Sequence, residues 1–216
     1  LSVNITGGTL DRLAVTNAAT GSITGSISGT NVKLLVGTNN GTVNVSVKGN
    51  ATVSSVITTN GASGSATIEV SGATVSGDLV AANAGVATIN LGSNIKIATT
   101  SANLVGVNTK TTTINVNSAL TLTGMNSFAF VGDSSGTINL NINAATSISG
   151  DTISGVVSKY SNTNTDEKAI NVVLKANYTL KGTTVSPIAG NTTGAGAFDA
   201  TKNLNYTQNG FNIIVK

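Results

Sequence analysis

The sequence predicts an all-β chain folded as a right-handed parallel β-helix, a β-solenoid with three strands per rung and about eight rungs. A short segment that alternates apolar and polar residues recurs along the chain, and two further apolar segments follow each copy after short turns. Equivalent residues lie about 21 to 26 positions apart in most copies. That spacing suits one turn of a coil whose stacked rungs bury a shared core.

The first recurrent segment has the period of a half-buried strand, because every second residue is apolar. Its copies are Thr42–Val45, Thr67–Val70, Thr88–Leu91, Thr113–Val116, Thr137–Leu140 and Ala169–Val172. The apolar residues are expected to point inward and the Asn or Glu residues outward. One internal column, with levels about 4.8 Å apart, is predicted to contain Val43, Ile68, Ile89, Ile114 and Ile138.

The other two segments supply the remaining faces of each rung. Thr74-Val75 and Tyr178–Leu180 are copies of the second segment, and Leu104-Val105 and Phe130-Val131 are copies of the third. The turns vary in length, which favours a right-handed over a left-handed coil, and parallel crossovers are right-handed by default. Several third segments are followed by Asn, and these amides are expected to stack into ladders: Asn39, Asn60, Asn83 and Asn108. An antiparallel sandwich would not repeat the same segment order at one period.

A single domain is expected, with the β-helix over residues 1–186 and a cap over residues 187–216. The cap begins with an irregular loop rich in Gly, Thr and Ala. It is predicted to end in a hairpin, since Asn209-Gly210 is the preferred type I′ turn dipeptide. Alternating apolar residues flank that turn, from Leu204 to Val215. Such a hairpin would cover the open end of the solenoid, which otherwise exposes unpaired strand edges.

The composition narrows the class of protein. Of 216 residues, 39% are hydrophobic, 9% are charged and none is cysteine, so disulfides and thiolate metal sites are excluded. The pI is about 9.3, but the basic residues form no cluster, which argues against nucleic-acid binding. No apolar stretch is long enough for membrane insertion. Without a starting Met or a signal peptide, the sequence reads as a mature fragment or excised domain, expected to be extracellular.

The sequence contains few side chains that could catalyse a reaction. The chain has no His and no Cys, and no serine lies in a nucleophile elbow. Asp78 and Asp151 are predicted to occupy the same corner of the coil three rungs apart, which separates their carboxyl groups by about 14 Å. The two carboxyl groups of a glycosidase lie roughly 5 to 9.5 Å apart. Asp166 and Glu167 adjoin, but calcium needs six to eight oxygen ligands. We therefore expect no enzymatic activity, no catalytic residue, no metal and no cofactor.

Aromatic residues gather in the C-terminal half, beyond residue 127: Phe128, Phe130, Tyr160, Tyr178, Phe198, Tyr206 and Phe211. Phe128 and Phe130 are expected to point one inward and one outward. The favoured interpretation is that the aromatics fill or cap the core. If they instead bind a ligand, the candidates are Tyr160, Phe198, Tyr178 and Tyr206.

Two stretches, TVNVSVKGNATVSSVITTNG and ATIEVSGATVSGDLV, carry a family resemblance. They resemble β-helical ectodomains of bacterial surface proteins, such as those beside S-layer-homology modules in Gram-positive bacteria, and autotransporter or haemagglutinin-type adhesin passengers. The resemblance is one of composition and period, and covers most of residues 30 to 180. A narrower similarity is to tāpirin-like cellulose-binding adhesins of Gram-positive thermophiles. The Asn-Gly steps at Asn40, Asn60 and Asn209, which deamidate when hot, argue against an extreme thermophile.

Two functions from different classes follow. The first is an extracellular structural or adhesive surface module, meaning a stalk, a surface-layer component or an adhesin, with binding loops in its C-terminal half. The second is a carbohydrate-binding module that attaches cells to an insoluble polysaccharide such as cellulose. The expected partners are such a polymer or copies of the chain itself. Aromatics on an exposed flat face would favour the second function, and aromatics buried at the end of the rod the first.

Overall fold

The fold is that of a computed structural model of the chain. The structure describes residues 2–7, 9–17, 22–28, 31–39, 41–60, 64–77, 79–82, 86–98, 100–107, 111–132, 137–158, 170–190, 201 and 204–216. Their secondary structure is almost entirely β-strand joined by short turns, and Thr201 alone has a helical backbone. The all-β prediction is confirmed.

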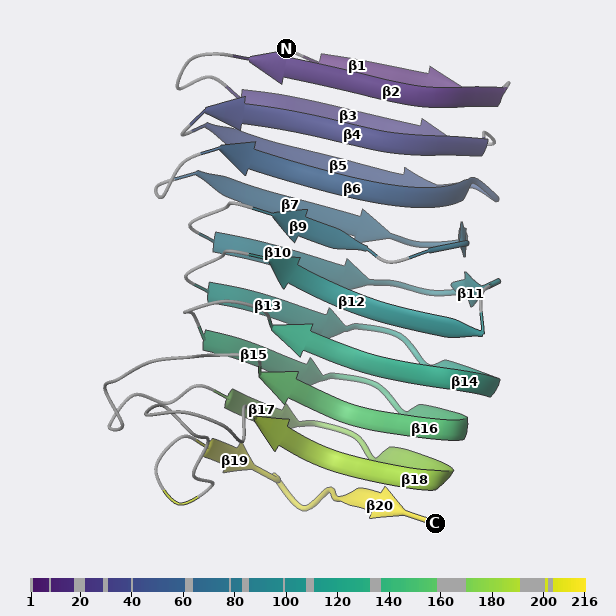
Figure 1. Cartoon of the computed structure of the whole chain (residues 1–216), viewed down its shortest axis with the longest axis vertical. Helices are drawn as coiled ribbons and strands as arrows, with labels where there is room; N and C mark the ends of the chain where they lie inside the picture. The colour runs from purple at the N-terminus through teal and green to yellow at the C-terminus, as the bar shows by residue number, and fades with distance from the viewer. Residues whose placement is uncertain are drawn as a thin grey trace.

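The strands form two sheets that lie face to face, with the N-terminus at one end of the stack and the C-terminus at the other (Figure 1). The nine-stranded sheet consists of β1 (Ser2–Thr6), β3 (Ser22–Ser28), β5 (Thr42–Lys48), β7 (Ser65–Val70), β10 (Val86–Leu91), β13 (Thr111–Val116), β15 (Thr137–Ile142), β17 (Ile170–Leu174) and β19 (Leu204–Thr207). The eleven-stranded sheet consists of β2 (Thr9–Asn17), β4 (Asn31–Asn39), β6 (Thr52–Asn60), β8 (Thr74–Val75), β9 (Val80–Ala82), β11 (Lys96–Ile97), β12 (Ser101–Val107), β14 (Leu120–Gly132), β16 (Thr146–Ser158), β18 (Tyr178–Gly190) and β20 (Ile213–Val215).

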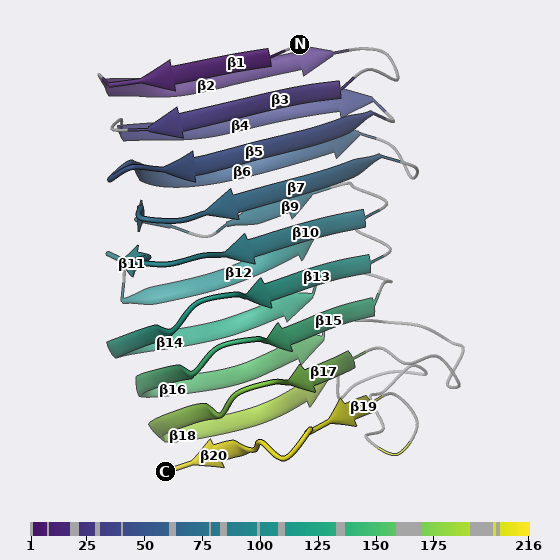
Figure 2. The same cartoon turned by 180° about the vertical axis from the view of Figure 1, so that it is seen from behind.

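The chain alternates between the sheets, and the two views from opposite sides show one sheet in front of the other (Figure 2). We call a strand of the nine-stranded sheet, together with the strand or strands of the other sheet that follow it, one level. Each strand pairs in parallel with its equivalent in the next level, as β13 pairs with β15 and β14 with β16. The predicted repeat of parallel strands is confirmed.

The structure has two sheets where the sequence predicted three faces, because the second and third predicted segments of a rung belong to the same sheet. In β14, β16 and β18 they form one continuous strand of 13 residues. In the middle of the stack they separate, as β8 and β9 or as β11 and β12. A glycine lies at the bend of β14. Gly124 has a φ of 68° there, a value that residues with a Cβ rarely adopt.

The predicted internal column is correct over its centre and shifted by two residues at its ends. Ile68, Ile89 and Ile114 are aligned in consecutive strands and are fully buried. Val45, not Val43, stands beside Ile68, and Leu140, not Ile138, stands beside Ile114. A shift of two residues keeps each side chain on the same face of its strand, so the sequence pattern fits both registers and packing selects one.

The predicted C-terminal hairpin is wrong. β19 pairs in parallel with β17 in one sheet, and β20 pairs in parallel with β18 in the other, so the two arms form one more level. The turn itself has the expected chemistry, since Asn209 and Gly210 have φ values of 50° and 81°. The preceding strand, β18, also continues to Gly190, beyond the predicted end of the helical part at residue 186.

A single large apolar cluster lies between the sheets. It is built from the inward residues of both sheets and includes Phe128 and Phe130, which are both buried. Their rings meet edge to face, with centroids 5.1 Å apart and planes at 84°. The prediction that one of them points outward is wrong, because residues two apart in a strand share a face.

Candidate functional site

The predicted ligand-contacting aromatics have different positions in the structure. Tyr160 and Phe198 lie outside the described residues, so their role stays a prediction. Tyr178, at the start of β18, is 0% exposed, and Tyr206, in β19, is half-buried. The described aromatics therefore do not form an exposed row on one face of the stack.

Tyr178 is a core residue, which corrects its assignment as a ligand contact. Its ring centroid lies 6.2 Å from that of Phe130. Its hydroxyl donates a 2.9 Å hydrogen bond to the carbonyl oxygen of Gly155 in β16. The phenol oxygen is thereby used inside the molecule, so no group of Tyr178 remains to contact a polymer outside it.

Replacing Tyr178 with Phe is expected to lower the free energy of unfolding by about 1–3 kcal/mol, because the buried carbonyl of Gly155 loses its donor. Burial also raises the pKa of Tyr178 well above the ordinary value of 10.0. The folded state therefore holds the phenol proton more tightly than the unfolded state does. The resulting stability is fully present below the unfolded pKa of about 10 and is lost as the pH rises from there through the raised pKa of the folded state. Urea denaturation at about pH 8 and about pH 11 would measure both effects.

The pH dependence gives this prediction its control. Wild-type stability should fall between the two pH values by more than that of Tyr178→Phe, since the variant lacks the raised pKa of Tyr178. An identical fall in both proteins would contradict the buried position of this hydroxyl.

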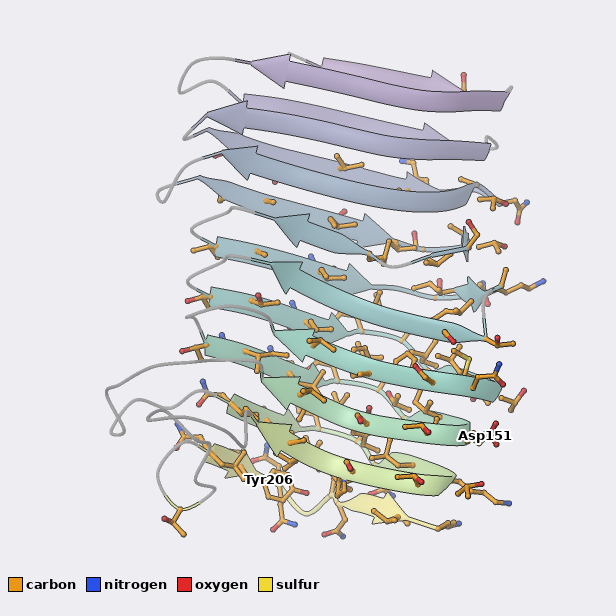
Figure 3. The ribbon with its side chains drawn as sticks, viewed as in Figure 1. Asp151 and Tyr206 are labelled. Atoms are coloured by element: carbon orange, nitrogen blue, oxygen red, sulfur yellow. The ribbon has the colours of Figure 1, made fainter. Side chains whose placement is uncertain are left out.

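Tyr206 closes the C-terminal end of the core, and Figure 3 labels it on the last level. It is aligned with the buried Val172 and packs against the apolar cluster. Its hydroxyl accepts a 3.2 Å hydrogen bond from the backbone N–H of Ile213, which joins β19 to β20. Phe211 and Ile213 pack on the same cluster. These contacts correspond to the capping interpretation of the aromatics.

The outer face of the nine-stranded sheet carries ladders of asparagine amides. Asn115 Nδ2 donates to Asn90 Oδ1, and Asn141 Nδ2 donates to Asn115 Oδ1, both at 2.7 Å. Parallel ladders with bonds of 2.7–2.9 Å comprise Asn139, Asn171 and Asn205, and Asn117 with Asn143. The sequence predicted amide ladders after the third segments. In the structure Asn39 and Asn60 are indeed aligned, while Asn83 and Asn108 lie outside the described residues.

The ladders on the strands themselves were missed, although the recurrent Ile-Asn pair was visible in the sequence. A separate ladder joins Asn117 and Asn143, which directly follow β13 and β15, and it ends at Asn143, whose Oδ1 is buried and has no hydrogen-bond partner among the described residues. The next position in that column belongs to Lys175. A lysine cannot continue an amide ladder, so the hydrogen-bonded array stops there.

The carboxylates of the described residues do not form a catalytic or metal site. Asp151 is exposed at the bend of β16 (Figure 3), and Glu69 is exposed in β7. Asp78, Asp166 and Glu167 lie outside the described residues, so the predicted separation of Asp78 from Asp151 stays a prediction. Within the described ranges, no group of three His, Cys, Asp or Glu residues could hold a metal ion.

In the part of the chain that the structure describes, no helix is both long and apolar enough to cross a membrane. No protein-family model, no curated protein and no solved structure matches the sequence or the fold of this chain.

Proposed function

We propose that the chain is an extracellular structural or adhesive module of a bacterial cell surface, built as a right-handed parallel β-helix. The alternation of strands between two parallel sheets supports the helical winding, because each return to the first sheet is a parallel crossover, and such crossovers are right-handed by default. The repeat and the low charge support the resemblance to surface-layer-associated and adhesin ectodomains.

The observation that carries the proposal is the use of the aromatic residues. Phe128, Phe130 and Tyr178 fill the core, and Tyr206 and Phe211 pack on its C-terminal end. The first three are buried and the last two are half-buried against the apolar cluster, so none of the five is a fully exposed ring. The described aromatics thus pack in or against the core, which suits a stalk or a layer component that presents its surface.

The outer face of the nine-stranded sheet supports the same function. Strands β10, β13, β15 and β17 contain no charged residue, and amide ladders cover their outer side. A flat, uncharged face repels neither a second copy nor a neutral polymer. The carbohydrate-binding alternative depends on Tyr160 and Phe198, which lie outside the described residues.

Incubation with insoluble cellulose, combined with a sizing measurement, tests the proposal. We expect weak retention on the polymer or self-association, and no turnover of cellulose, xylan, pectin or alginate with calcium supplied. If retention occurs, Tyr160→Ala and Phe198→Ala should reduce it while the unfolding transition is unchanged, which would favour the carbohydrate-binding alternative. Steady release of reducing ends or unsaturated sugars, abolished by Asp78→Asn or Asp151→Asn, would overturn the proposal.

A further inference from the structure

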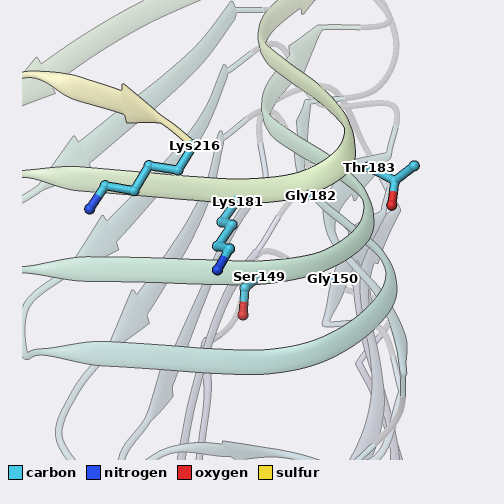
Figure 4. Close-up of a pocket in the computed structure, with 6 residues that line it drawn as sticks. All are labelled: Ser149, Gly150, Lys181, Gly182, Thr183 and Lys216. Carbon is cyan, nitrogen blue, oxygen red and sulfur yellow. The ribbon is translucent and has the colours of Figure 1, made fainter.

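A hollow of about 350 Å³ lies on the outer face of the eleven-stranded sheet, near its C-terminal end. It forms where β16 and β18 bend, as the close-up in Figure 4 shows. Its lining consists of Ser149, Gly150, Lys181, Gly182, Thr183 and Lys216. No Asp or Glu is among these residues, so the only charged side chains of the lining are the two lysines.

Strand register brings the two lysines together. Ser149 is aligned with Lys181 in the neighbouring strands β16 and β18. Leu180 is aligned with Val215, and the backbone N–H of Lys216 donates to the carbonyl of Leu180 at 2.9 Å. The two lysines therefore occupy equivalent positions in adjacent levels, which lie about 4.8 Å apart. Because Leu180 is buried, its neighbour Lys181 points outward, and it is exposed.

The floor of the hollow is a pair of aligned glycines, Gly150 and Gly182. A Cβ on Gly150 would collide with the backbone of Met125, and a Cβ on Gly182 would lie 2.8 Å from the carbonyl oxygen of Gly150. The backbones of successive levels approach too closely there for any side chain. The gap between Lys181 and Thr183 is thus fixed by backbone packing rather than by the position of a mobile side chain.

The two charged side chains of the hollow, Lys181 and Lys216, are both positive. Among the described residues, neither ammonium group has an ion-pair partner, although both lysines are exposed. Asp151 lies two residues beyond Ser149, on the bend, and is not part of the lining. Like charges on adjacent levels repel each other. An anion with several oxygens, placed between them, would accept hydrogen bonds from both ammonium groups, and charge-assisted bonds of this kind are the stronger ones.

The hydroxyl groups beside the lysines complete the set of donors. Thr183 borders the hollow at the far side of the glycine pair (Figure 4). Ser149 Oγ donates a long hydrogen bond of 3.4 Å to the carbonyl of Leu122. A bond of that length is weak, so this hydroxyl can turn toward an anion at low cost.

We propose that this hollow binds an oxyanion group of an acidic polysaccharide, a carboxylate or a sulfate, between Lys181 and Lys216. The inference rests on the proposed function, since it specifies the polymer that the surface module contacts. The hollow lies open on the outside of the stack (Figure 4), so a group carried on a long chain can enter while the rest of the chain stays in solvent. Two lysines occupy adjacent levels here, whereas β10, β13, β15 and β17 of the other sheet contain no charged residue.

The test uses the 216-residue chain at low ionic strength, where electrostatic contacts are least screened. Inorganic sulfate is titrated while the backbone amide signals of Gly150 and Gly182 are followed by NMR. Retention is measured in parallel on immobilised polygalacturonate, dextran sulfate and neutral dextran. We expect saturable shifts at the two glycines, and retention on one or both acidic polymers but not on neutral dextran. The two acidic polymers distinguish a preference for carboxylate from one for sulfate.

The double variant Lys181→Gln with Lys216→Gln is compared with Lys48→Gln and Lys96→Gln. Both pairs remove the same charge, and Lys48 and Lys96 are exposed in other levels, away from the hollow. We expect at least about a tenfold loss of affinity in the first variant and less than about a twofold loss in the control. Equal losses in both, or unchanged binding in the first, would overturn the site. Turnover and self-association are measured in separate experiments. If the hollow does not bind the anion, those experiments still decide whether the proposed function holds.

Discussion

Ile89→Asn is expected to lower the free energy of unfolding by about 4 kcal/mol or more. Ile89 is 0% exposed and stands between Ile68 and Ile114 in the internal column. The substitution removes a packed aliphatic side chain and places an amide where the neighbouring levels offer only apolar groups. The two costs add, because the cavity and the unsatisfied amide are separate effects. Chemical denaturation followed by circular dichroism measures the loss.

Asn90→Ala is the matched control, one residue away on the outer face. It removes the acceptor of the 2.7 Å ladder bond from Asn115, and the amide left behind can turn to water. The expected loss is about 1 kcal/mol, the net value of one hydrogen bond. If the two variants lost equal stability, the inside and outside of β10 would be assigned wrongly.

Gly150→Ala is expected to cost about 3 kcal/mol or more, or to prevent folding of the C-terminal levels. The added methyl group would occupy the space of the Met125 backbone in the adjacent strand β14. Met125 is aligned with Gly150 in the parallel ladder between β14 and β16, so its backbone atoms cannot move away as a flexible side chain could. The expected result is a lower melting temperature and increased hydrogen exchange in β14, β16 and β18.

Gly124→Asn provides the control for this prediction in the neighbouring level. Gly124 has a φ of 68°, and a Cβ at this position would meet no atom within 4 Å. Asparagine tolerates that backbone conformation better than most residues. The expected loss is about 1 kcal/mol, the cost of the left-handed backbone for Asn, and thus smaller than at Gly150. A larger loss at Gly124 than at Gly150 would show that backbone conformation, and not the approach of successive levels, requires glycine at the bend.

The sequence alone predicted correctly which face of the recurrent strands β7, β10 and β13 points inward, although it assigned Phe128 and Phe130 of β14 to opposite faces. Alternation is a local property with a period of two, so Ile68, Ile89 and Ile114 had to lie inward once these segments became strands. Turn chemistry is equally local. The positive φ values of Asn209 and Gly210, and the 2.9 Å hydrogen bond from the N–H of Phe211 to the carbonyl of Gln208, follow from those residue types.

Register and pairing depended on the tertiary structure. Val43 and Val45 both satisfy the alternation, and only packing against the next level places Val45 beside Ile68. The Asn90–Asn115–Asn141 ladder and the Lys181–Lys216 pair exist because of that register, since each joins residues of different levels. The alternation of residues along one strand does not determine which residue of the neighbouring level lies beside a given residue.

The C-terminal segment shows the same division most clearly. The sequence by itself determined a turn at Asn209-Gly210 with an apolar strand on either side. Only the tertiary structure decided that β19 and β20 pair with β17 and β18 instead of with each other. The existing sheet edges offer both strands a full set of hydrogen bonds, and their apolar residues Leu204, Tyr206 and Ile213 extend the core. A local hairpin would leave the β17 and β18 edges unpaired and the end of the core exposed.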